Sequence, residues 1–249
     1  NAVNYLNYYG FLDFEIKSEY KDESQIIELV NSIKSRIAND DIDADDYHEF
    51  LSNFGSYLDI DKPSLFSNIS YFINFQLSKM YFRYFMWNFS GRQNDKQWKY
   101  DLENGNWISG INIIDEYRLG PQKNLPLDVI NNKARNQYYL IPFILGIIGL
   151  IFIFKKNLKI FWPIFLLFIF TGIALKFYLN ERVFEPRERD YALVGSFYTY
   201  CIFIGFSFIA ISEYLSKYLK NNFSFLLAIV ITITSPLLLS FNNWDDHDR

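Results

Sequence analysis

Four long apolar stretches occupy the C-terminal part of the chain, and short charged segments separate them. They run at roughly 138–154, 160–179, 191–212 and 223–241. A helix needs about 20 apolar residues to cross the hydrocarbon core of a bilayer, with a usual range of about 17–25. The first stretch is at the short end of that range. Buried helices of a soluble protein rarely give four such runs in succession, so the pattern predicts four transmembrane helices.

The region before these stretches, residues 1–137, is polar and acidic, and part of it has helical periodicity. Residues 18–60 are expected to form helices joined by short polar turns, because apolar side chains recur every three or four positions at Ile26, Ile27, Val30, Ile33 and Ile37.

The segment "NDDIDADDYHEF" has alternating acidic residues, as a calcium-binding loop does. It has Asp46 where the loop needs glycine and Ser52 where it needs a bidentate glutamate. We therefore interpret it as a solvated acidic helix start.

A strongly aromatic segment, residues 72–89, reads "FINFQLSKMYFRYFMWNF" and includes Gln76, Lys79 and Arg83. Aromatic rings and long cationic side chains are both favoured at the depth of lipid headgroups. Two interpretations remain open: an interfacial helix that packs on the bundle, or one wall of a groove for a lipid substrate.

Together these patterns predict a mainly α, polytopic membrane protein. Residues 1–137 form a helical and loop segment outside the membrane, residues 138–241 form the transmembrane helices, and residues 242–249 begin a further region outside the membrane. The net charge of −4 and the lack of a basic stripe argue against nucleic-acid binding. The single cysteine, Cys201, excludes an internal disulfide.

Lysines between the apolar stretches predict the orientation. Lys155, Lys156 and Lys159 lie in one loop, and Lys217 and Lys220 lie in another. The positive-inside rule places both loops in the cytoplasm. Arginines in the loop at 180–190 weaken this prediction, because they put positive charge on the opposite side of the membrane as well. Residues 1–137, the 180–190 loop and residues 242–249 are then expected to share the outer face.

Two polar clusters on that face combine cations with carboxylates. "GRQND" contains Arg92, Asn94 and Asp95, which could bind a phosphate and a sugar hydroxyl together; an ordinary polar loop is the alternative. "EPRERD" places Arg187 and Arg189 at the end of a membrane helix, where their guanidinium groups suit a phosphate at headgroup level. Its acidic residues, Glu188 and Asp190, would orient these arginines or bind sugar hydroxyls. A charged spacer between two helices is the alternative.

A third cluster, "NNWDDHDR", ends the chain and contains residue types that bind metals: Asp245, Asp246 and His247. Adjacent residues rarely converge on one ion without ligands from elsewhere, so a polar network at a helix end is the preferred interpretation, and no metal site is predicted.

Several segments, in this order, resemble one family: "MYFRYFMWNFSGRQND", "GNWISGI", "ARNQYYLIPFILGIIGL", "EPRERDYALVGSFY" and "NNWDDHDR". The family comprises bacterial membrane proteins, once labelled a domain of unknown function, that are grouped with the transmembrane protein O-mannosyltransferases of the GT-C glycosyltransferase superfamily. The resemblance covers most of residues 70–249. It implies a multi-pass enzyme of the bacterial inner (plasma) membrane, with residues 1–137 and the 180–190 loop in the periplasm.

The resemblance also implies a reaction. A sugar, expected to be mannose, would pass from a polyprenyl-phosphate carrier to serine or threonine of exported proteins, with the lipid-linked sugar as donor substrate and no certain cofactor. Arg92, Arg187 and Arg189 would bind the lipid phosphate. Asp95, Asn94, Trp107, Glu188 and Asp190 would contact the sugar or orient the arginines. The catalytic acidic residue is expected upstream of Asn1, which makes the chain an internal fragment.

Two other classes of function remain open. The chain could be a non-catalytic scaffold subunit of a secretion or cell-envelope assembly. A lipid or ion transporter is a weaker alternative, because charged residues concentrate in the loops and Lys176 is the main exception.

Overall fold

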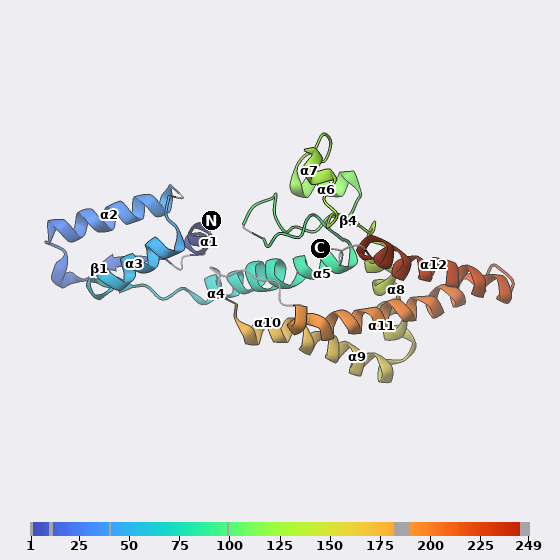
Figure 1. Ribbon diagram of the computed structural model, residues 1–249. Helices are drawn as coiled ribbons and strands as arrows, with labels where there is room; N and C mark the ends of the chain where they lie inside the picture. Colours follow the sequence, from blue (N-terminus) through green and yellow to red (C-terminus); the bar gives the residue numbers. More distant parts are fainter. Residues whose placement is uncertain (1, 10–11, 40, 99, 182–189, 245–249) are drawn as a thin grey trace. The chain divides into compact units, whose positions relative to one another are not determined.

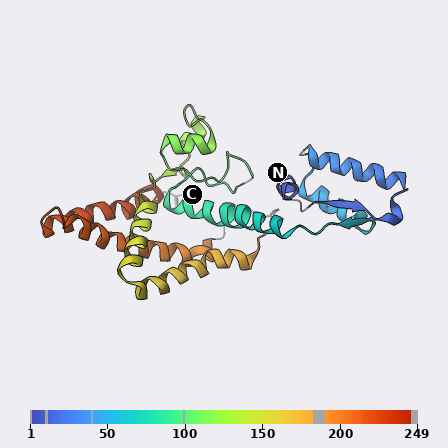
Figure 2. The ribbon, with the colours of Figure 1, turned by 180° about the vertical axis from the view of Figure 1, so that it is seen from behind.

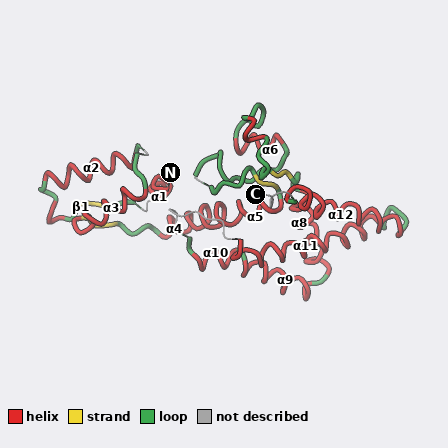
Figure 3. The backbone as a smooth tube through the Cα atoms, viewed as in Figure 1, coloured by secondary structure: helices red, strands yellow, loops and turns green. Residues whose placement is uncertain are grey.

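The computed structural model describes residues 2–9, 12–39, 41–98, 100–181 and 190–244, and it confirms a mainly α-helical fold (Figures 1 and 3). The chain divides into two compact units. The N-terminal unit comprises Asn1–Gln76 and Glu181–Pro186, and the helical unit comprises Leu77–Asn180 and Arg187–Arg249. The units therefore divide well before residue 137, where the composition changes.

The described residues of the N-terminal unit form four α-helices, two 3₁₀ turns and one two-stranded sheet. Its helices are α1 (Ala2–Tyr8), α2 (Ser24–Ala38), α3 (Ala44–Phe54) and α4 (Leu65–Tyr71), its 3₁₀ turns are Ser18–Tyr20 and Gly55–Tyr57, and its strands are β1 (Phe14–Ile16) and β2 (Leu58–Ile60). The strands pair antiparallel, with Phe14 opposite Ile60 and Glu15 opposite Asp59. Residues 18–60 were expected to be only helices and turns, so β2 is an addition to that prediction.

The predicted apolar face of α2 lies in the core of this unit. Ile26, Val30, Ile33 and Ile37 are buried against Phe14, Tyr47, Phe50 and Leu58. The acidic segment forms a helix start as predicted: the Asp43 side chain accepts a hydrogen bond of 2.8 Å from the Asp46 backbone N–H, which caps α3.

The aromatic segment is helical over its whole length but changes type. A π-helix covers Phe72–Phe82, and α5 continues from Arg83 to Phe89. In the helical unit its C-terminal part is buried among the long apolar helices, with Tyr81, Tyr84, Phe85, Met86 and Phe89 in one core cluster. This part of the segment therefore packs on the bundle.

The helical unit continues through a loop region into the long helices (Figure 2). The loop region contains the strands β3 (Gly91–Arg92) and β4 (Asn136–Gln137), which pair antiparallel, and the short helices α6 (Asn112–Leu119) and α7 (Leu127–Ile130). The long helices are α8 (Ile141–Lys156), α9 (Leu158–Thr171), α10 (Ile173–Leu179), α11 (Asp190–Leu215) and α12 (Asn221–Asn243).

Among the described residues, three helical segments are long and apolar enough to cross a membrane: Leu158–Leu179, Tyr191–Leu215 and Asn221–Asn243. They correspond to the second, third and fourth predicted stretches. The first of them comprises α9 and α10, which meet at Gly172. The remaining predicted stretch forms α8, whose 16 residues span about 24 Å at 1.5 Å per residue, less than the hydrocarbon core of about 30 Å.

Helix α11 is central to the helical unit and packs against α8, α9 and α12. It runs parallel to α8, with Tyr200 beside Gly146 and Phe203 beside Gly149. A Cβ atom at Gly149 would collide with the backbone oxygen of Phe203, so glycine permits this close approach. At the far end Lys156 binds both carboxylate oxygens of Glu213, at 2.9 and 2.8 Å. Helices α8 and α11 therefore end, and α9 and α12 begin, at the lysine-rich end of the unit.

Candidate functional site

A polar cleft of about 380 Å³ lies at the opposite end of the helical unit. Side chains from α5, β3, the loop after β3, the segment between β4 and α8, and the end of α12 surround it: Tyr84, Trp87, Asn88, Arg92, Asp95, Gln97, Tyr138, Leu239 and Asn243. It lies about 34 Å from the lysine-rich end, because the 23 residues of α12 separate the two ends.

Glycines allow the loop beside the cleft to fold tightly. Gly91 has a φ of 143°, and a Cβ atom there would collide with the backbone oxygen of Asn136 on β4. Gly105 has a φ of 63° and is enclosed by the backbone of residues 96–98. A Cβ atom would displace β4 at Gly91 and the backbone of residues 96–98 at Gly105, so both positions require glycine.

Two buried amides hold this loop together. The Asn94 Nδ2 donates to the backbone oxygen of Glu103 (2.8 Å), and its Oδ1 accepts from the N–H of Gly105 (2.9 Å). Gln93 similarly donates to Leu102 and accepts from Asn106. The amide of Asn94, predicted to contact the sugar, is therefore engaged within the loop, and we do not include it among the ligand contacts.

Arg92 and Asp95, both predicted from the sequence, line the same cleft. The Arg92 Nε donates to the backbone oxygen of Ala134 (2.9 Å), and its guanidinium carbon lies 5.9 Å from the centre of the Trp87 ring. Asp95 is exposed at the rim. The structure thus combines a cation held against an indole with a solvent-facing carboxylate.

Trp87 is part of the cleft, although sequence reasoning did not single it out. Within the described part of the chain, its indole Nε1 is buried without a hydrogen-bond acceptor. An unsatisfied buried donor costs about 1–3 kcal/mol, so an acceptor supplied by a ligand or a water would stabilise the site. No sequence signal separates Trp87 from the other aromatic residues of 72–89.

A network that sequence reasoning also missed joins the end of α12 to β4. Asn243 Nδ2 donates to the Tyr138 hydroxyl (2.9 Å), and Asn136 Nδ2 donates to the Asn243 Oδ1 (3.0 Å). Asn136 is buried. The starts of "NNWDDHDR" and "ARNQYYLIPFILGIIGL" thus meet at the cleft, although more than 100 residues separate them. Both segments carry the family resemblance, but only the fold brings them together.

Trp107, predicted to contact the sugar or to orient the arginines, is not among the residues that line the cleft. The Arg118 guanidinium stacks on its ring at 3.4 Å and donates to its backbone oxygen (3.0 Å). Burial lowers the pKa of Arg118 to about 10, partly offset by Asp115, so Arg118 stays charged at neutral pH. Asp115 is buried and accepts hydrogen bonds from the backbone N–H groups of Ser109 and Gly110. These contacts fix residues 107–118, which lie outside the cleft lining.

The remaining predicted site residues cannot be placed. Arg187, Glu188 and Arg189 lie outside the described residues, as do Asp245, Asp246 and His247. Asp190 begins α11, but its side chain is not described. Where side chains are described, no group of three or more His, Cys, Asp or Glu residues is suited to hold a metal ion.

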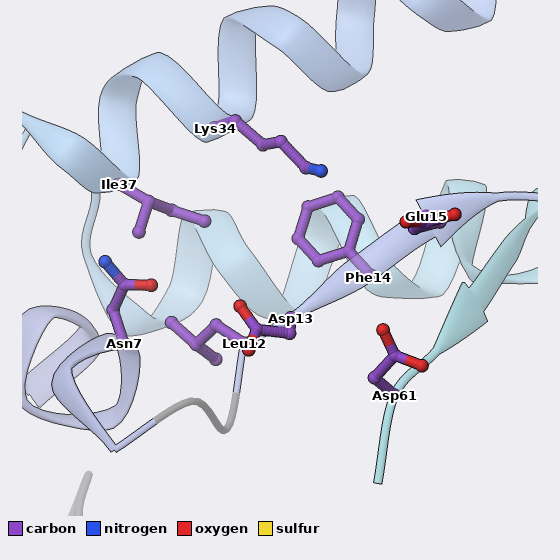
Figure 4. Close-up of a pocket in the computed structure, with 8 residues that line it drawn as sticks. All are labelled: Asn7, Leu12, Asp13, Phe14, Glu15, Lys34, Ile37 and Asp61. Carbon is purple, nitrogen blue, oxygen red and sulfur yellow. The ribbon is translucent and has the colours of Figure 1, made fainter. Parts of the chain in front are cut away.

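A second pocket, of about 370 Å³, belongs to the N-terminal unit (Figure 4). Asp13, Glu15 and Asp61 bring three carboxylates to it, and the Lys34 ammonium lies 5.1 Å from the centre of the Phe14 ring. The register of the sheet places Glu15 directly opposite Asp59, so the exposed face of the two strands is acidic. The charged side chains of this pocket are exposed to solvent, and the buried residues Leu12, Phe14 and Ile37 of the unit's core lie beside them.

Comparisons with protein-family models, with curated proteins and with solved structures give no significant match. The resemblance to the O-mannosyltransferase family therefore stays a prediction.

Proposed function

We propose that this chain is part of a membrane glycosyltransferase. The enzyme moves a sugar, expected to be mannose, from a polyprenyl-phosphate carrier to serine or threonine of exported proteins. One observation carries the proposal. Arg92, held against Trp87, and Asp95 share a polar cleft at the end of the apolar helices. A lipid-linked sugar needs such a place, because its phosphate and sugar are polar while its carrier lies in the bilayer.

The cleft residues match the groups of such a donor. A guanidinium forms paired, charge-assisted hydrogen bonds with phosphate oxygens, and it would stabilise the charge that grows on the leaving phosphate. Sugar hydroxyls both donate and accept hydrogen bonds. The Gln97 amide in the lining can do both, and the Asn88 amide can accept through Oδ1, while its Nδ2 already donates to the backbone oxygen of Tyr84 (2.9 Å). Asp95 would accept from a sugar hydroxyl or orient Arg92.

We further propose four membrane crossings, with the cleft on the periplasmic side. Helix α8 is short, but it contacts α11 from Gly146 to Lys156 and would share its depth in the bilayer. The positive-inside rule then puts the lysine-rich end in the cytoplasm and the cleft at the outer surface.

Thiol accessibility tests this topology. In a Cys201→Ser background, Glu103→Cys should react with a membrane-impermeant maleimide added to intact spheroplasts, whereas Lys217→Cys should react only after lysis. Glu103 is exposed in the loop beside the cleft, and Lys217 lies at the lysine-rich end. The reverse labelling pattern would overturn the orientation.

Glycoproteomics of exported proteins tests the activity. Deleting the gene should remove a hexose mass from Ser- or Thr-containing peptides, and the unaltered gene should restore it. Arg92→Ala should fail to restore it, whereas Lys96→Ala, a change of equal charge at an exposed residue of the same loop, should succeed. Unchanged glycans after deletion would refute the transferase, and loss of an envelope assembly instead would support the scaffold.

A further inference from the structure

Cations and indole rings alternate from the aromatic segment to the polar cleft. The Lys79 ammonium lies 5.3 Å from the Trp98 ring centre, and the Arg83 guanidinium carbon lies 5.7 Å from the same ring. Arg83 also lies 5.5 Å from the Trp87 ring centre, and Arg92 lies 5.9 Å from it. We call Lys79, Trp98, Arg83, Trp87 and Arg92 the cation–indole stack. It ends at the residue assigned to the donor phosphate.

Arg83 is the central member of this stack and is only 4% exposed. Its Nε donates to the backbone oxygen of Lys79 (2.9 Å), and its Nη1 donates to the backbone oxygen of Gly105. Removing a guanidinium from water costs several kcal/mol, and an apolar side chain of similar volume often stabilises such a site equally well or better. Packing alone therefore gives little reason for an arginine here.

Two sets of contacts connect Arg83 to the charged residues of the cleft. Through Trp87, which contacts both guanidinium groups, Arg83 restrains the ring against which Arg92 is held. Through the Gly105 oxygen it holds the chain whose N–H binds the Asn94 side chain, directly before Asp95. Both sets of contacts therefore reach residues that line the same cleft.

We propose that Arg83 is a positioning residue that sets where Arg92 and Asp95 stand relative to each other. Its role in donor binding rests on the function proposed above, whereas its role in holding the loop on α5 does not.

A distance measurement tests the positioning without any ligand. Spin labels at Ser78→Cys and Glu103→Cys, in a Cys201→Ser background in nanodiscs, report the position of the loop relative to the aromatic segment. Both residues are exposed, and neither lines the cleft. The parent should give one narrow distance distribution by pulsed electron resonance. Arg83→Met should broaden it, because the loop loses its tie to α5.

Two further variants keep this test decisive. Arg118→Met is the matched control, since Arg118 also stacks on an indole and donates to a backbone oxygen of the loop region but lies outside the stack. It should leave the distribution narrow. Arg83→Lys keeps the charge without the planar group and should broaden it partially. The proposal would be overturned if Arg83→Lys left the distance distribution unchanged and Arg83→Met either left it unchanged as well or failed to fold.

Binding of farnesyl phosphate to the nanodisc protein, followed by tryptophan fluorescence, separates this inference from the proposed function. Loss of one well-aligned charge-assisted hydrogen bond corresponds to about a tenfold loss of affinity. We expect about that loss for Arg83→Met, a smaller loss for Arg83→Lys, and none for Arg118→Met. No binding to the parent protein would refute the donor site. Equal binding by the parent and Arg83→Met would refute the role of Arg83 in it.

Discussion

The two units of this protein differ in what they bury and what they expose. Residues 1–76 contain 14 Asp and Glu but only five Lys and Arg, and their core is formed by Ile, Val, Leu and a few aromatic residues. The helical unit instead exposes large apolar side chains along its long helices, such as Leu167, Leu226 and Leu237. Its buried residues include small hydroxyl side chains, such as Ser196 and Thr199.

The difference follows from the solvent that each surface suits. In water, burying apolar area is the main driving force for packing, so an acidic exterior and an aliphatic core are sufficient. In lipid that force between helices is absent, and close contact through small residues replaces it. Gly149 and Gly146 supply this contact between α8 and α11. The two units should therefore respond differently to the same kind of substitution.

The largest effect is expected from a cavity in the N-terminal unit. Phe50 is buried and contacts Phe14, Tyr47 and Phe54. Phe50→Ala should reduce the stability of this unit by about 3–5 kcal/mol, measured as lost hydrogen-exchange protection of α2 and α3. Phe66→Ala, at a residue 81% exposed in the same unit, is the control and should change little. Equal losses for both would mean that the hydrophobic core is wrongly assigned.

In the helical unit, adding a single methyl group should have the next largest effect. Gly149→Ala forces α8 away from the Phe203 backbone and should cost about 1–3 kcal/mol, measured by steric trapping in bicelles. Gly205→Ala on α11 is the matched control, because a Cβ atom there meets nothing within 4 Å. A stable Gly149→Ala protein would show that α8 and α11 do not depend on backbone contact.

A smaller and stabilising effect is expected on the acidic sheet face. Glu15 and Asp59 are directly opposite, and like charges in this arrangement are unfavourable. Asp59→Lys should stabilise the N-terminal unit by up to about 1 kcal/mol at low salt, seen as slower exchange of the β1 and β2 amides. Glu28→Lys makes the same charge change at an exposed position of α2. If it stabilises as much, net charge and not the cross-strand pair is responsible.

The smallest effect concerns the lysine-rich end of the helical unit. The side chains of Lys156 and Glu213 are 57% and 48% exposed, so their ion pair should contribute only about 0.2–1 kcal/mol. A double-mutant cycle with alanine at both positions measures this coupling, and added salt should weaken it if that end is in water. A coupling that salt leaves unchanged would indicate that this end is shielded from water.

Local periodicity was enough to predict the apolar face of α2 and the acidic start of α3. The short strands were missed, because three-residue strands depend on a partner that is distant in the sequence. In the site, cation and carboxylate chemistry pointed to Arg92 and Asp95. The same reasoning assigned a ligand contact to Asn94, whose amide the fold uses to close its own loop.

Sequence alone determined where the long apolar helices are, because segment hydrophobicity and length are local properties. It also determined that lysines gather in the loops at one end. Only the tertiary structure decided that Trp87, Tyr138 and Asn243 complete the cleft around Arg92. Those residues meet through packing between segments far apart in the chain, and the spacing of residues along the sequence carries no record of such contacts.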